Sequence, residues 1–174
     1  MNAKYDHLEA LMMHVRASIP NPELGLPDPV FAFAMEIVPM VNVDLLLRDE
    51  AGKILLAWRE DALGIGWHIP GGIIRLNEQF SDRIRAVADR ELGVDVEHEA
   101  DPCCILDVDR SYKRGHFISL LFRCRAISKF RRPYLFANPN SPRHEDIAWF
   151  ATPPQEMYPT RAYPAWIWAQ RPTE

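Results

Sequence analysis

The stretch "GGIIRLNEQFSDRIRAVADRELGV", residues 71–94, decides the fold. Its tandem glycines, Gly71 and Gly72, let the backbone bend and approach a ligand closely. The residues that follow predict a helix over 78–92 with Asn77 as its cap. One side of this helix repeats at spacings of four, three and four residues, at Phe80, Ile84, Val87 and Glu91.

Glu91 is the unexpected residue on this apolar side. A carboxylate in the last helical turn opposes the helix dipole, at a cost of roughly 0.3–1 kcal/mol. A carboxylate that faces the protein body without a partner is more costly still. Glu91 is therefore either a tolerated surface residue or the ligand of something positive, and its place on the apolar side favours a cationic partner.

Length and charge restrict the classes of function. A chain of 174 residues suits one domain with a real core, and 48% hydrophobic with 25% charged residues is ordinary for a globular protein. The net charge of −4 provides no basic field, so neither a nucleic-acid nor a membrane partner is expected. Any anionic ligand must be met by local arginines or by a metal ion.

The cysteines and the N-terminal segment point to the cytoplasm. Cys103, Cys104 and Cys124 form an odd set with no C-x-x-C pair, which argues against a disulfide framework and a cysteine zinc site. Residues 1–23 are charged and interrupted, unlike a signal peptide. No apolar run approaches the ~20 residues that span a bilayer.

Helical and strand patterns alternate along the rest of the chain. A helix is predicted over 5–17, and a second over 28–37, with Asp28 as its cap and Pro29 as its first residue. A hairpin is predicted from strands 41–48 and 53–59, which turn at "DEAG". Further strands are expected at 103–109, 116–125 and 144–152, and a last helix at 161–170. The interleaving indicates an α/β or α+β sandwich.

At this point the motif resembles a known family. The Nudix box is a glycine, five residues, Glu, seven residues, Arg-Glu, a hydrophobic residue, any residue, Glu-Glu, any residue, Gly and a hydrophobic residue. The spacing is kept by Gly72, Glu78, Glu91, Gly93 and Val94. The similarity to the Nudix hydrolase superfamily extends from about residue 38 to 168. It implies an α/β/α sandwich with a mixed sheet over 38–174, preceded by a helical extension over 1–37.

The box is degenerate. Ala86 and Val87 replace its Arg-Glu pair, and Arg90 replaces the first Glu of Glu-Glu. The carboxylate cluster that holds several divalent ions in ordinary Nudix pyrophosphatases therefore cannot form. The GDP-mannose mannosyl hydrolases have a similarly reduced box with a single metal, and they cleave the sugar C–O bond. The segments "HEDIAWF" (144–150) and "TRAYPAW" (160–166) also resemble that branch.

The resemblance implies a site for a nucleotide sugar in a homodimer, with the helix over 5–17 packed across the dimer. It places Mg²⁺ on Glu91 and the carbonyl of Gly71. It makes His144 the general base, brings Arg59 to the diphosphate and Asp44 close to the sugar. Further candidates are Glu78 for catalysis and Asp109, Arg114 and His116 for substrate binding. Arg143 stands where the branch has a Gln that helps hold the metal.

Two other functions remain open on the same residues. The first is a pyrophosphatase that rebuilds its metal site from Glu78, Glu91 and either Glu145 or Asp146. The second is a catalytically inactive Nudix domain that binds a nucleotide. Ordinary structural roles also exist, because a helix-end Glu often pairs with a nearby Arg and a lone His often lies in an exposed loop.

Overall fold

The computed structural model describes residues 3–61, 64–108, 115–131, 141–158 and 163–169. Its centre is a mixed sheet in the order β4-β1-β7-β5, with β6 also paired to β7. The strands are β1 (Met40–Leu47), β4 (Gly71–Ile73), β5 (Val96–His98), β6 (Cys104–Val108) and β7 (Phe117–Ala126). β1 and β7 run parallel, and the other pairs are antiparallel.

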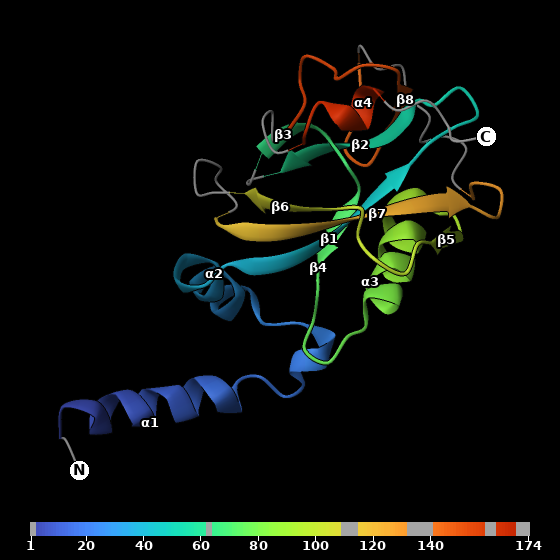
Figure 1. Ribbon diagram of the computed structural model, residues 1–174. Coiled ribbons are helices and arrows are strands. Elements are labelled where there is room, and N and C mark those ends of the chain that lie inside the picture. The colour runs from blue at the N-terminus through green and yellow to red at the C-terminus, as the bar shows by residue number, and fades with distance from the viewer. Residues whose placement is uncertain (1–2, 62–63, 109–114, 132–140, 159–162, 170–174) are drawn as a thin grey trace.

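A second, antiparallel sheet has the order β3-β2-β8. It contains β2 (Ile54–Asp61), β3 (Gly64–His68) and β8 (Ile147–Phe150). Figure 1 shows α3 (Phe80–Val87) against one side of the mixed sheet and α4 (Trp166–Ala169) over the second sheet on the other side. The expected α/β/α sandwich with a mixed sheet is confirmed.

β1 is buried on both faces, which explains the near-continuous apolar run "VNVDLLL". Val43 and Leu45 belong to the core beneath α3, together with Ile84 and Val87. Leu46 belongs to the second core, which α4 closes. β1 therefore contributes side chains to both cores, one beneath α3 and one beneath α4.

The expected hairpin over 41–59 is wrong, although both strands form. β1 pairs with β4 and β7 in the mixed sheet, whereas β2 pairs with β3 and β8 in the other sheet. One isolated bridge, Arg48 to Ile54, joins the two strands next to the turn. Because both edges of β1 are already occupied, β2 turns away into a second layer.

The helix of the box differs from the expectation at both ends. α3 begins at Phe80 with Gln79 as its cap, and Asn77 instead takes a left-handed backbone with φ of 60°. The last turn, η2 (Ala88–Leu92), is a π-helix that ends at Gly93 with φ of 62°. Single π turns occur frequently at functional sites. Here the π turn carries Glu91.

The N-terminal segment has two parts. α1 (Ala3–Ala17) extends away from the sandwich, while η1 (Pro22–Leu24) and α2 (Asp28–Ile37) lie against it (Figure 1). α2 begins at Asp28 with Pro27 as its cap, so the expected capping role of Asp28 is wrong. None of the described helices is long and apolar enough to cross a membrane.

The three cysteines are free, as expected. Cys124 on β7 is 8% exposed, and burial raises the pKa of its thiol to about 12. Trp166 and Trp168 pack against the second core.

Candidate active site

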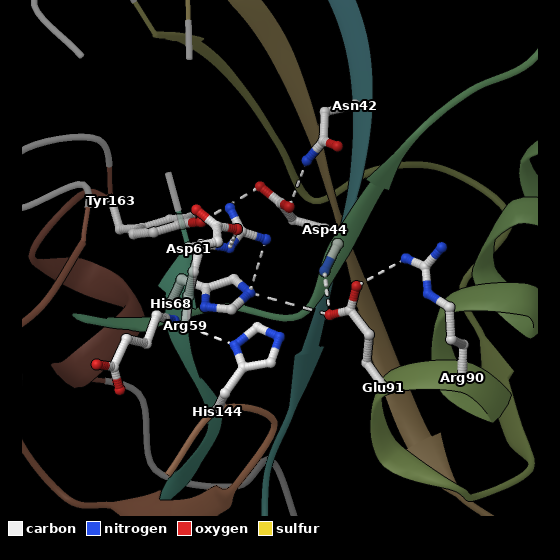
Figure 2. A network of polar contacts seen from close by, with 11 residues as sticks. Asn42, Asp44, Arg59, Asp61, His68, Arg90, Glu91, His144 and Tyr163 are labelled. Carbon is white, nitrogen blue, oxygen red and sulfur yellow. Dashed lines mark hydrogen bonds and ion pairs between the residues drawn. The ribbon is translucent and has the colours of Figure 1, made fainter. Parts of the chain in front are cut away.

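Four segments that are distant in the sequence meet around one small pocket of about 130 Å³. β2 supplies Arg59, β3 supplies His68, η2 supplies Glu91, and the turn before β8 supplies His144. Figure 2 shows the side chains of these residues converging on the same space. The fold thus brings together three of the predicted site residues, Arg59, Glu91 and His144.

Glu91 lies at the edge of this pocket with a side chain that is 18% exposed. Its Oε1 accepts a hydrogen bond from Nη2 of Arg90 at 2.9 Å. Its Oε2 accepts from the backbone N–H of Gly71 at 3.3 Å and lies 3.9 Å from Nε2 of His68 (Figure 2). Within the chain, Glu91 is therefore paired with the neighbouring arginine, the ordinary alternative for a helix-end Glu.

Arg59 is held at the bottom of the pocket and is 12% exposed. Its Nε lies 3.4 Å from Oδ2 of Asp61, and its Nη2 lies 3.3 Å from Nε2 of His68. Its Nη1 is buried and finds no hydrogen-bond partner within the described part of the chain. A buried guanidinium N–H without a partner is costly, so this donor is suited to an anionic ligand oxygen.

His144 is held against β2 by backbone contacts. Its Nδ1 accepts a hydrogen bond from the N–H of Glu60 at 3.2 Å, while the neighbouring Glu145 N–H donates to the carbonyl of Trp58 at 3.0 Å. A neutral imidazole that accepts at Nδ1 carries its proton on Nε2. As a base, His144 must therefore give up the Glu60 bond, which costs about 0.5–1.5 kcal/mol for a typical hydrogen bond.

Asp44, which the resemblance brings close to the sugar, is buried and only 3% exposed. Its carboxylate accepts hydrogen bonds from Nδ2 of Asn42 at 2.5 Å, from Oγ of Ser119 and from the hydroxyl of Tyr163 at 3.4 Å. In the β1–β4 ladder it lies opposite Gly71. These contacts let Asp44 support the strand that carries the tandem glycines.

Glu78 and His116 also have partners of their own. Oε2 of Glu78 accepts from Nε of Arg83 at 2.8 Å and from the N–H of Arg75 at 2.9 Å, which holds the loop before α3. Nε2 of His116, next to the start of β7, lies 2.8 Å from Oδ1 of Asp107. Asp109 and Arg114 lie outside the described residues.

Two residues at this site were not predicted from the sequence. His68 had no recognisable ligand spacing, and Arg90 was interpreted only as the loss of a carboxylate. The pattern "GWHIP" contains one signal for His68, because a histidine within a buried apolar strand requires a polar partner. Arg90 offers no such signal, since its role depends on which way the π turn directs it.

The donors at the site fit one divalent ion. Mg²⁺ is usually held by one or two carboxylates together with waters and substrate phosphates, and Glu91 with the backbone of Gly71 can supply the protein part. Among the described residues, no three His, Cys, Asp or Glu side chains lie together as a metal site. The arrangement therefore suits a single ion that arrives with a diphosphate, and it does not suit a cluster of ions.

A larger pocket of about 550 Å³ adjoins the small one. The two share Arg59, Arg90 and Glu91 in their walls. One wall of the large pocket comes from residues 22–31, and the opposite wall from residues 71–76 of the box loop. A volume of this size is in the usual range for small-molecule sites.

Comparison with known proteins identifies the class. The model of the NUDIX domain matches residues 38–168, and the chain therefore belongs to the Nudix hydrolase family. The low-salt glycan biosynthesis protein Agl8 of Haloferax volcanii is 40% identical over 90 residues, which cover 51% of this chain and 57% of Agl8. The match thus spans little more than half of that relative.

Two solved structures share the fold. A MutT NUDIX hydrolase from Burkholderia pseudomallei aligns with a TM-score of 0.56 and 24% identity, covering 71% of this chain and 94% of that one. An ADP-ribose pyrophosphatase from Streptococcus suis aligns with a TM-score of 0.54 and 22% identity, covering 76% and 88%. At these identities the likeness concerns the fold alone.

Proposed function

We propose that this protein is a Mg²⁺-dependent hydrolase of a nucleotide sugar resembling GDP-mannose. It would release a nucleoside diphosphate and a free hexose by attack of water at the anomeric carbon. The observation that carries the proposal is the small pocket, where Glu91, the remaining carboxylate of the box's Glu-Glu pair, faces Arg59, His68 and His144. The name of Agl8, a low-salt glycan biosynthesis protein, agrees with a sugar-containing substrate.

In this proposal, different residues of the small pocket act on the two ends of the bond that breaks, the diphosphate and the anomeric carbon. Nη1 of Arg59 donates to a diphosphate oxygen and stabilises the negative charge that develops as the sugar departs. His144 orients the attacking water and takes its proton, since histidine titrates near neutral pH. A bound Mg²⁺, on Glu91 and the Gly71 carbonyl, would supply further charge neutralisation for the leaving group.

The substrate would extend across both pockets. The small pocket of about 130 Å³ accommodates the reacting sugar, and the shared wall of Arg59, Arg90 and Glu91 meets the diphosphate. The nucleoside would then occupy the large pocket, where Phe31 and Leu26 of the N-terminal segment face the box loop. Residues 1–37 form an extension of the domain at 38–174. Through residues 22–31, this extension would take a direct part in binding.

Isotope labelling tests the reaction. Purified protein is incubated with GDP-mannose, other nucleotide hexoses and Mg²⁺ in ¹⁸O-labelled water, and the products are followed by NMR and mass spectrometry. We expect the label in the free hexose and loss of activity in EDTA. Label in phosphate would instead show cleavage of the P–O bond by a pyrophosphatase, and absence of turnover with every nucleotide hexose would contradict the proposal.

We also propose a homodimer in the cytoplasm, formed through α1. Leu8, Leu11 and Met12 on this helix are each close to half exposed, at 49%, 49% and 47%. The helix extends away from the sandwich (Figure 1), so these side chains are accessible to a second copy. Light scattering on the full chain and on a chain that lacks residues 1–17 tests this. We expect the full chain to be a dimer and the shortened chain to be a monomer. The same number of chains per particle in both samples would contradict the proposal.

A further inference from the structure

Arg90 is directed toward the ligand site by the π turn in which it lies. On one side of it, Oδ1 of Asp89 pairs with Nη2 of Arg131 at 2.6 Å, and the Arg131 N–H donates to the carbonyl of Gly93 at 2.7 Å. Adjacent residues on an ordinary helix do not face each other. Here Arg90 nevertheless reaches Glu91 at 2.9 Å and lines both pockets.

Two of the other arginines at these pockets have carboxylate partners, and Arg75 lines only the large pocket. Arg83 is 4% exposed and paired with Glu78, and Arg59 is held between Asp61 and His68. The side chain of Arg90 is 58% exposed. An ion pair with so exposed a partner is weak and exchanges readily, so Arg90 can leave Glu91 when a better partner arrives.

We propose that Arg90 is a cation built into the site, which occupies Glu91 while no divalent ion is bound and turns to the ligand diphosphate once an ion takes the carboxylate. A guanidinium suits both positions, because its planar fork matches a carboxylate and a phosphate equally well. This inference rests on the proposed diphosphate ligand. Arg90, which stands where the box has a glutamate, would thus have a functional role in place of the lost carboxylate.

Two consequences can be measured without turnover. In the free protein, Arg90 competes with the ion for Glu91, so its removal strengthens metal binding. Once an ion occupies Glu91, Arg90 is a principal contact of the diphosphate, so its removal weakens nucleotide binding in the presence of the ion. The two effects have opposite signs, which a general loss of structure cannot produce.

The experiment compares Arg90→Gln with Arg90→Lys and with Arg85→Gln. Arg85 is a suitable control because it lies on α3, is 65% exposed and pairs with Asp82, away from both pockets. Mn²⁺ affinity of the free protein is measured by electron paramagnetic resonance, and GDP affinity at saturating Mg²⁺ by calorimetry. For Arg90→Gln we expect Mn²⁺ to bind about tenfold more tightly and GDP about tenfold more weakly, the size of one charge-assisted hydrogen bond.

Arg90→Lys should retain part of both effects, and Arg85→Gln should behave as the unsubstituted protein. Unchanged Mn²⁺ affinity or unchanged GDP affinity in Arg90→Gln overturns the inference. The Mn²⁺ measurement needs no substrate, so it separates this inference from the proposed function. If no nucleotide hexose is hydrolysed but both binding effects occur, the reaction is wrong and the role of Arg90 stands.

Discussion

The two pockets that meet at Glu91 are built in different ways. The small pocket is formed by segments within residues 38–168, and its polar side chains are held by one another and by backbone N–H groups. The large pocket adds residues 22–31, which precede the family match, and combines apolar side chains with arginines. In the proposed function, the small pocket is the reaction centre and the large pocket is the recognition site beside it.

This contrast explains how a degenerate box can remain useful. Loss of carboxylates removes the means to bind several ions, but it leaves Glu91 and the tandem glycines in place. The arginine gained at position 90 lies where the two pockets join. The pockets can therefore be tested separately, since one should control the reaction and the other the affinity.

The largest expected effect concerns the small pocket. Substitution His144→Ala removes the proposed base, and we expect kcat to fall about 10²–10⁴-fold while GDP affinity stays unchanged. The control is His116→Ala, because His116 pairs with Asp107 and lines neither pocket. Steady-state kinetics on the nucleotide sugar checks both variants. An equal loss in the control would contradict the assignment of the reaction to this pocket.

The wall that the tandem glycines form in the large pocket should tolerate added side chains poorly. A Cβ at Gly71 would lie 1.9 Å from Oδ1 of Asp44 and 2.8 Å from the carbonyl of Val43. Because Asp44 is buried and held by three partners, we expect Gly71→Ala to lower the free energy of unfolding by about 3 kcal/mol.

The neighbouring glycine is the control for this substitution. A Cβ at Gly72 would meet Cγ2 of Val87 at 2.9 Å and Cδ of Arg83 at 3.2 Å, and neither is a backbone atom or a hydrogen-bonded carboxylate oxygen. We expect Gly72→Ala to cost about 1 kcal/mol, measured like Gly71→Ala by urea denaturation. If the two variants are equally stable, the buried Asp44 network is not rigid.

A third prediction concerns the large pocket. Phe31 lines it from α2, whereas Phe33 on the same helix is 50% exposed and does not. Phe31→Ala should weaken GDP binding about tenfold through lost apolar contact, with kcat little changed. Phe33→Ala should leave both quantities unchanged. Calorimetry with GDP and Mg²⁺ measures the affinities, and similar values for the two variants would place the nucleoside elsewhere.

The smallest effect is expected from α1. Deletion of residues 1–17 leaves residues 22–31, and with them the wall of the large pocket, in place. GDP affinity should therefore stay within about twofold of the full chain, which corresponds to less than 0.5 kcal/mol. A much larger loss would mean that α1 itself, or dimer formation through it, contributes to the site.

Local patterns in the sequence determined much of this protein. The spacing from Gly72 to Val94 indicated the family and singled out Glu91, and the apolar repeat of Ile84 and Val87 predicted the buried side of α3. Such signals are readable because a helix or strand repeats over a few residues. The loss of two of the box's carboxylates also followed directly from the identities of residues 87 and 90.

The tertiary structure alone decided which distant residues meet. It sent β1 and β2 into different sheets, buried Asp44 under the glycines, and brought His144 to the backbone of Glu60, 84 positions away. It also placed residues 22–31 beside the box loop and directed Arg90 onto Glu91 through a π turn. The physical reason is that these contacts depend on how sheets stack and how one helical turn widens, and neither property has a short repeat in the sequence.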